Sequence, residues 1–538
     1  VELHSRLIAT NVKNDADRTF TAINTLPQKR KDTVIVKTYV PGGKFAIIDE
    51  KGNDVDYTII KSRDLTDYVL SQTIMLDPSR KFYVPDQVLE VTMAIKANDV
   101  PALGYVQYSI DTQKDSHKET ADKKVLENKY YTIEVEENGS LTIVDKANNV
   151  TYKNQGILVE NGDDGDSFNY SPPRKDMEVF SNESKCTVKI SGSDIYDQAE
   201  IHFDMVVPAD LDERAEGKVS VTMLVDMTVA LRKDSKVIDF NVKVDNKGLS
   251  HRLCVLFDSQ IVSAFNYADQ QFGLIKRPNY YEKEMKLYME SMNNKTEKKA
   301  GIQELANWAN DQSTWQEPPI SIEPTQSYVS LTDGKTGIAV IPQGVREYEV
   351  LDDSKIRLTL FRTYGFMGKE NLIYRPSRAS GERIIETPAA QLLKEMEFNF
   401  GFTSYAGDIN DSDIDTLAKQ YNTNLEVYTY AEFLNGRLIF SQREIEGQNA
   451  KIHSLFETEG NLVVSAVKKA EEDDGYIIRL YNGKDHKDLD DKIKFNFDIK
   501  EAYYTNLKEE KTEEIKVENN TISVKELSHC KFVTIWVK

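Results

Sequence analysis

The chain has 538 residues, and its 88 acidic against 68 basic side chains give a formal net charge of −20 at pH 7. Such an acidic excess repels nucleic-acid phosphates and anionic lipid headgroups, so neither nucleic acid nor a membrane surface is an expected partner. Three widely spaced cysteines and the absence of a long apolar run argue against a disulfide framework and a membrane span, and they favour a cytoplasmic location.

The N-terminal part of the chain is expected to contain a helical tail, one β-sandwich and a linker. Apolar residues at helical spacing within residues 1–18 predict the end of a helical region whose packing partners lie upstream. Short apolar runs between Gly, Pro and Asp turns predict a first antiparallel β-sandwich over residues 19–110. Residues 111–124 are almost entirely polar, with Ala121 as their single apolar residue, and are expected to form a solvated linker.

The rest of the chain is expected to hold a large central sandwich, a helical linker and a C-terminal sandwich. Residues 131–143 alternate apolar and polar side chains around an Asn-Gly turn, which predicts an antiparallel hairpin. The same alternation recurs through residues 125–405, as expected for two packed sheets of long antiparallel strands. Residues 406–424 match a short amphipathic helix, and residues 425–538 return to strand patterns. The expected fold class is therefore mainly β, with multiple antiparallel β-sandwich domains.

An acidic loop at residues 161–173 is the most informative segment of the sequence. It reads Asn-Gly-Asp-Asp-Gly-Asp-Ser-Phe-Asn-Tyr-Ser-Pro-Pro, so glycines permit its turns and two prolines stiffen its end. Asp163, Asp166 and Tyr170 are expected to bind a polyhydroxylated ligand, and replacing Asp166 should barely affect folding. Neighbouring carboxylates on one loop do not supply the separate acid and nucleophile of glycoside hydrolysis, so no catalytic residue is predicted. An exposed acidic turn without function is the alternative.

A second loop, within residues 362–383, carries the basic candidates. Arg375 and Arg378 bracket an Arg-Pro-Ser-Arg turn and are expected to form bidentate bonds to sugar hydroxyls or to a carboxylate. Salt bridges to neighbouring acids are the alternative interpretation. The seven histidines have no short spacing to a second His or Cys, so no metal site is predicted in this chain. Trp315 is the aromatic residue expected to be free for stacking on a sugar ring.

The acidic loop resembles the Gly-Asp-x-Tyr-x-x-Ser-Pro-Pro block in the C-terminal half of bacterial glycoside hydrolase family 38 alpha-mannosidases. Phe168 stands where that pattern has its Tyr. Further blocks that resemble the family follow one another in the family's order, at residues 24–30, 101–105, 127–131, 251–253, 269–272, 277–278 and 360–391.

The resemblance implies that the chain is the non-catalytic C-terminal region of a retaining, zinc-dependent alpha-mannosidase. In that family the zinc ion and the aspartate nucleophile belong to an N-terminal barrel, and a mutarotase-like central sandwich bears against it. The implied partners are an alpha-mannoside or another carbohydrate and the barrel itself, with homo-oligomers also possible. The acidic loop and an arginine, matched to Arg375 or Arg378, would then face the substrate cleft. The chain alone is expected to be inactive. An independent carbohydrate-binding assembly of β-sandwiches is the alternative.

Overall fold

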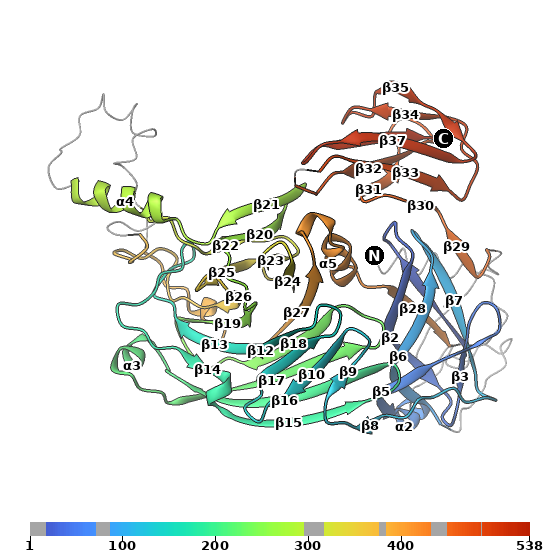
Figure 1. The fold of residues 1–538 in the computed structure, drawn as a ribbon. Coiled ribbons are helices and arrows are strands. Elements are labelled where there is room, and N and C mark those ends of the chain that lie inside the picture. The colour runs from blue at the N-terminus through green and yellow to red at the C-terminus, as the bar shows by residue number, and fades with distance from the viewer. Residues whose placement is uncertain (1–17, 72–86, 295–316, 376–383, 432–448, 486) are drawn as a thin grey trace.

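The computed structural model describes residues 18–71, 87–294, 317–375, 384–431, 449–485 and 487–538. The described residues form seven antiparallel sheets with few helices between them (Figure 1). The expected mainly β fold with several antiparallel sheets is therefore confirmed. Most of the expected N-terminal helical tail, Trp315 and Arg378 lie outside the described residues. None of the described helices is both long enough and apolar enough to span a membrane.

The first sandwich packs a six-stranded sheet against a three-stranded one around a buried apolar core. The larger sheet contains β1 (Arg18–Asn24), β3 (Ala46–Ile48), β4 (Asp54–Val55), β7 (Gly104–Asp111), β28 (Glu426–Ala431) and β29 (Ile452–Ser454). The smaller sheet contains β2 (Arg30–Val40), β5 (Tyr57–Asp64) and β6 (Leu89–Val100), with helix α2 (Thr66–Ser71) after β5.

The assignment of residues 425–538 to one C-terminal sandwich needs a correction. β28 pairs with β1 along its length, from Arg18 opposite Ala431 to Ile23 opposite Glu426, and β29 pairs with β7. β1 is buried at nearly every position, so its two edges both need a partner strand, and β28 supplies the second one. The strands between residues 426 and 454 thus complete the first sandwich.

The central region has a ten-stranded sheet, a six-stranded sheet and a four-stranded sheet around one large apolar core. In the ten-stranded sheet the strands are β8 (Ala121–Asp122), β15 (Lys185–Gly192), β16 (Tyr196–Val207), β17 (Val221–Arg232), β18 (Ile238–Asp245), β20 (Phe265–Gln270), β21 (Gly273–Pro278), β23 (Val329–Thr332), β24 (Thr336–Gln343) and β27 (Glu395–Ala406). The six-stranded sheet contains β13 (Ile157–Gly162), β14 (Val179–Phe180), β19 (His251–Asp258), β22 (Glu323–Pro324), β25 (Glu347–Leu351) and β26 (Lys355–Arg362). The four-stranded sheet contains β9 (Leu126–Glu127), β10 (Tyr131–Val135), β11 (Leu141–Asp145) and β12 (Val150–Gln155).

Helices in and after the central region are short. They are α3 (Leu211–Glu216), α4 (Glu282–Asn294), α5 (Ile414–Asn422) and the single 3-10 turns η1 (Ser181–Glu183), η5 (Pro388–Gln391) and η6 (Ile409–Asp411). The C-terminal sandwich follows, with β30 (Phe456–Thr458), β31 (Val463–Lys469), β32 (Tyr476–Tyr481), β33 (Leu489–Phe495), β34 (Ala502–Thr505), β35 (Lys511–Ile515), β36 (Val517–Glu518), β37 (Thr521–Leu527) and β38 (Phe532–Val537). Its two sheets enclose a third apolar core.

Arginines join the first sandwich to the central region. Arg232 of β17 makes a two-point contact with Asp239 and also donates to Asp32 of β2 at 2.7 Å. Arg30 pairs with Asp32 and donates to the backbone carbonyls of Gln420 and Thr423 at the end of α5. A cation at the C-terminal end of a helix satisfies carbonyls that have no partner within the helix. The first sandwich and α5 are therefore held to one face of the central region.

The C-terminal sandwich contacts the central region through one hairpin and one helix. The ring of Phe272, in the turn between β20 and β21, lies 5.6 Å from the ring of Tyr481 and 5.8 Å from that of Phe532. Gly273 beside it has no room for a side chain, because a Cβ atom there would lie 2.8 Å from the Sγ atom of Cys530. Lys484 reaches across to pair with Asp415 of α5 at 2.5 Å.

Asp269 at this junction makes stability depend on pH. Burial, reinforced by the nearby Asp415 carboxylate, raises the pKa of Asp269 from 3.8 to about 6. A carboxyl with a raised folded-state pKa favours folding at low pH, and that contribution is lost as pH rises through about 6. We therefore expect Asp269→Asn, which keeps an acceptor for the Ser327 hydroxyl, to stabilise the chain at pH 7.5 by roughly 1–2 kcal/mol. Denaturant unfolding should show a smaller gain at pH 5, and an equal gain at both pH values would contradict this.

Candidate functional site

The two loops singled out in the sequence meet at one edge of the six-stranded sheet. β13 and β26 both pair antiparallel with β19, so they run in the same direction and end on either side of the first residues of β19. The acidic loop, residues 163–173, follows β13, and the basic loop, residues 363–375, follows β26. A backbone hydrogen bond from Ser167 to Phe366 joins them directly. The strand order therefore brings together charges that lie about 200 residues apart in the sequence.

Arg362, at the end of β26, binds the start of the acidic loop. Its Nε atom donates to Asp163 Oδ2 at 2.6 Å and its Nη2 atom to Asp163 Oδ1 at 3.2 Å. The same Nη2 atom donates to the backbone carbonyls of Asp166 and Asn169, at 2.9 Å each. Asp163 is only 1% exposed, and burial raises the pKa of its carboxyl, which the Arg362 contact offsets only in part. One guanidinium thus fixes the loop at three points.

Arg375 of the basic loop binds Asp166 in the same way. The Asp166 carboxylate accepts hydrogen bonds from the Arg375 guanidinium and from the backbone amides of Phe168, Asn169 and Lys369. Burial favours a higher pKa for Asp166, but the Arg375 bond and these amides outweigh it and hold the pKa below its ordinary value. With 0% exposure, Asp166 is an ionised carboxylate whose acceptor positions face inward.

The remaining sequence candidates are also engaged within the protein. Asp164 pairs with Lys369, so each of the three carboxylates of the acidic loop has its own cation. Tyr170 is buried with its ring 4.0 Å below the Arg252 guanidinium, and its hydroxyl accepts from Asn161. The sequence predicted that Asp163, Asp166 and Tyr170 contact a ligand directly. In this structure these three residues have almost no exposed surface for such a contact. The observed contacts of Arg375 match the alternative interpretation, in which it forms a salt bridge to a neighbouring acid.

A second buried ionic cluster, which the sequence reasoning missed, lies under the acidic loop. Glu160 of β13 pairs with Arg214 and accepts from His251 Nδ1 at 2.9 Å. His251 Nε2 lies 2.9 Å from Asn246 Oδ1, whose amide nitrogen is used by two other carbonyls, so both imidazole nitrogens face acceptors. The sequence signal was a Glu directly after the apolar run Ile-Leu-Val in β13, at a fully buried position.

Two profiles of one enzyme family match the chain. The profile described as "Glycosyl hydrolases family 38 C-terminal domain" matches residues 126–366 and contains both loops. The profile described as "Glycosyl hydrolases family 38 C-terminal beta sandwich domain" matches residues 461–534. The chain belongs to glycosyl hydrolase family 38. The resemblance seen in the sequence is therefore confirmed.

Individual relatives share this architecture but are longer. A Halalkalibacterium halodurans protein provisionally named mannosylglycerate hydrolase is 24% identical over 420 residues, which are 74% of this chain and 40% of that protein. The crystal structure of a family 38 protein from Enterococcus faecalis has a TM-score of 0.75 at 18% identity, over 100% of this chain and 60% of that one. An alpha-mannosidase structure from Enterococcus faecalis V583 has a TM-score of 0.73 at 19% identity, over 98% and 57%. The chain thus spans less than two thirds of each relative.

The ion-paired loops of this family 38 chain expose several large apolar side chains. Phe168, at the tip of the acidic loop, is 59% exposed, although the backbone amides of both its neighbours in the loop donate hydrogen bonds within the protein. The exposed Met367 and Ile373 lie on the basic loop, and the exposed Ile384 and Ile385 lie beside it, joined by a backbone bond from Met367 to Ile385. We call Phe168, Met367, Ile373, Ile384 and Ile385 the apolar rim. Buried charged side chains therefore fix the loops, and the apolar rim shares their outer surface with polar residues such as Glu370 and Asn371.

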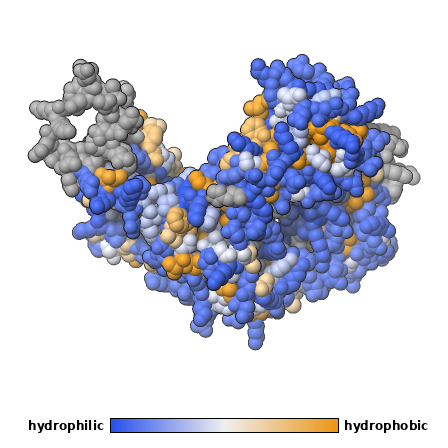
Figure 2. All heavy atoms as spheres, turned by 45° about the horizontal axis from the view of Figure 1, so that its top comes forward, coloured by the Kyte–Doolittle hydropathy of each residue, from blue (hydrophilic) through white to orange (hydrophobic). Residues whose placement is uncertain are grey.

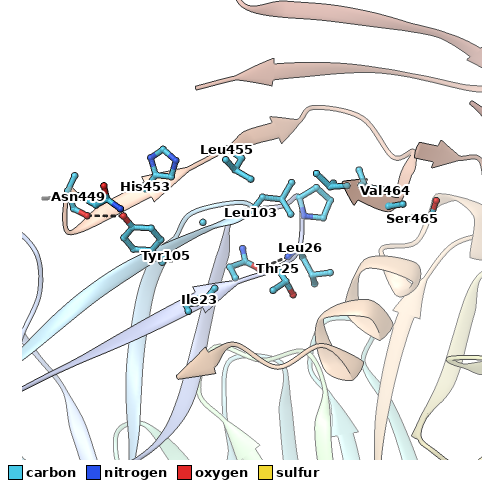
Figure 3. Close-up of a pocket in the computed structure, with 16 residues that line it drawn as sticks. Ile23, Thr25, Leu26, Leu103, Tyr105, Asn449, His453, Leu455, Val464 and Ser465 are labelled. Atoms are coloured by element: carbon cyan, nitrogen blue, oxygen red, sulfur yellow. Dashed lines mark hydrogen bonds between the residues drawn. The ribbon is translucent and has the colours of Figure 1, made fainter. Parts of the chain in front are cut away.

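A metal-ligand cluster and a large cavity are two other features that could mark a functional site. In the described part of the chain, no three His, Cys, Asp or Glu side chains converge as metal ligands. A cavity of about 790 Å³ opens between the first and C-terminal sandwiches, with Leu26, Leu103 and Leu455 in its middle and Tyr105 and His453 at one end (Figure 3). Its described lining contains no Asp, Glu, Lys or Arg, so it offers a polyhydroxylated ligand amide, hydroxyl and imidazole groups but no charged carboxylate, ammonium or guanidinium group.

Proposed function

We propose that this chain is the C-terminal, non-catalytic region of a retaining, metal-dependent alpha-mannosidase. Family 38 membership and the alpha-mannosidase among the structural relatives support this. About 40% of the length of each structural relative lies outside the part that this chain matches. A retaining glycosidase needs two free carboxyl groups about 5 Å apart. All three carboxylates of the acidic loop are already paired with cations, so we assign the acid, the nucleophile and the zinc ion to the catalytic barrel.

The apolar rim is the observation that carries the proposal. Loops built on buried ion pairs are rigid, and apolar side chains on rigid loops mark surfaces that another body covers. We therefore assign the rim to the contact with the catalytic barrel, next to the substrate cleft. Asp163 and Asp166 then act as positioning residues, since they hold the rim without touching an alpha-mannoside. An independent carbohydrate-binding assembly is the second candidate, favoured only if no barrel is encoded before Val1.

The rim can be tested in the enzyme that includes the preceding coding region. We expect Phe168→Ser to lower kcat/KM for an aryl alpha-mannoside by about tenfold or more, because a misplaced cleft loop weakens transition-state binding. Tm should change little, since the ring is exposed. Leu224→Ser is the matched control, because Leu224 is 44% exposed on the long strand β17, which lies outside the two loops. Equal kcat/KM values for the two variants would mean that the apolar rim does not lie next to the substrate cleft.

The non-catalytic role has its own test. The chain alone, folded and purified, is expected to show no turnover of the same aryl alpha-mannoside above a protein-free blank. The longer protein should show turnover that a chelator removes. Turnover by the chain alone would overturn the proposal, as would a longer protein that folds and still does not cleave the substrate.

A further inference from the structure

The C-terminal sandwich carries an open groove of about 570 Å³ far along the chain from the two loops. It is lined by the β34–β35 turn, by the beginning of β38 and by Lys525 of β37. Since β37 belongs to one sheet of the sandwich and β34 and β38 to the other, the groove lies across the gap between the sheets. Most of the face of the molecule drawn in Figure 2 is hydrophilic, whereas the groove contains exposed apolar side chains.

Two exposed apolar side chains form the wall of the groove. Phe532 is 42% exposed, and Leu507, in the β34–β35 turn, is 63% exposed. The Phe532 ring is not free to swing away, because it stacks on Phe272 at 5.8 Å with 29° between the ring planes. A fixed ring with an exposed surface loses little conformational entropy when a ligand packs on it.

Hydroxyl and charged groups form the floor and the edge. The Thr505 hydroxyl oxygen is buried and has no hydrogen-bond partner within the described chain. Thr534 lies opposite Thr505 in the β34–β38 pairing, and its hydroxyl accepts from Arg479 at 3.1 Å. Glu510 and Lys525 add a carboxylate and an ammonium group at the edge, and the Glu510 carboxylate also accepts from Asn506 at 2.6 Å. Because the Thr505 hydroxyl is buried, Glu510 and Lys525 are charged groups that a ligand in the groove can contact in its place.

We propose that this groove binds a hexopyranose unit of a carbohydrate. A pyranose ring has an apolar C–H face, which suits Phe532 and Leu507, and an edge of hydroxyls, which suits Glu510 and Lys525. The cavity shown in Figure 3 has apolar walls without such charged groups, so it suits a pyranose ring less well. The groove lies in a different sandwich from the apolar rim, so the inference does not depend on the proposed function.

The test is a titration of the chain alone with methyl alpha-D-mannopyranoside, followed by amide NMR shifts and calorimetry. We expect saturable binding that Phe532→Ala weakens by about tenfold, the loss expected when an aromatic stacking partner is removed. Glu510→Gln, at an edge position where folding is not at risk, should also weaken it. Tyr476→Ala is the matched control, because Tyr476 is similarly exposed on the same sandwich and does not line the groove.

Glycerol supplies hydroxyls without a ring face and should cause no saturable shifts at the same concentration. Saturable binding that Tyr476→Ala weakens as much as Phe532→Ala would overturn the assignment of this groove. No saturable binding of the mannoside, or an equal response to glycerol, would overturn it as well. Because no turnover is measured, the result stands apart from any loss of alpha-mannosidase activity.

Discussion

Replacing Asp166 with alanine is expected to destabilise the chain by about 3–5 kcal/mol, the usual cost of breaking a buried ion pair. The variant leaves the Arg375 guanidinium buried without its carboxylate and frees three backbone amides that the same carboxylate binds. Asp166 is held by Arg375 inside the protein, so the expectation from the sequence that folding would barely change does not fit the structure. Denaturant unfolding of the purified chain measures the change in free energy.

Asp164→Ala is the matched control for this variant. Asp164 and its partner Lys369 are both partly exposed, and such pairs contribute at most about 1 kcal/mol. The two substitutions remove the same group from the same loop, so their difference isolates the effect of burial. Equal unfolding free energies for the two variants would mean that Asp166 is as accessible to water as Asp164.

Glu160→Gln is expected to cost about 3 kcal/mol or more, because it removes the buried charge shared by Arg214 and His251. A glutamine can keep its oxygen at the position of Glu160 Oε1, which both partners contact, but it is neutral, so the buried Arg214 loses the carboxylate it pairs with. Its amide hydrogens would then lie where Glu160 Oε2 lies, an atom without a hydrogen-bond partner in the described chain. The loss should spread to the loops, since the backbone of Ser250 and His251 binds the amides of Asp163 and Thr363. Hydrogen exchange at those two amides should accelerate together with the loss of stability.

Glu178→Gln separates this effect from the loss of an ordinary charge. Glu178 is partly exposed, and its partner Arg357 keeps a second carboxylate, Glu349. We expect this change to lower the free energy of unfolding by less than about 1 kcal/mol and not to accelerate hydrogen exchange at the Asp163 amide. Accelerated exchange in both variants would show that the loops respond to net charge and not to the Glu160 cluster.

Local patterns predicted local structure well, whereas contacts between distant segments had no local signal. The hairpin at residues 131–143 formed as expected, because its two strands and its turn lie within one short stretch. The pairing of β28 with β1 joins segments about 400 residues apart, and neither strand has a sequence pattern that identifies its partner. The charges of the two loops were recognised from the sequence, but whether they faced solvent or each other depended on β13 and β26 ending at the same edge of the sheet, on either side of β19.

The pairing of β28 with β1 also limits how this protein can be divided. A chain cut after residue 424 would keep β1 but lose the strand that covers its outer edge. The exposed edge would present unpaired amides and carbonyls, which promote aggregation between copies. The N-terminal sandwich therefore cannot be exchanged as an independent module, because a segment translated more than 300 residues later completes it.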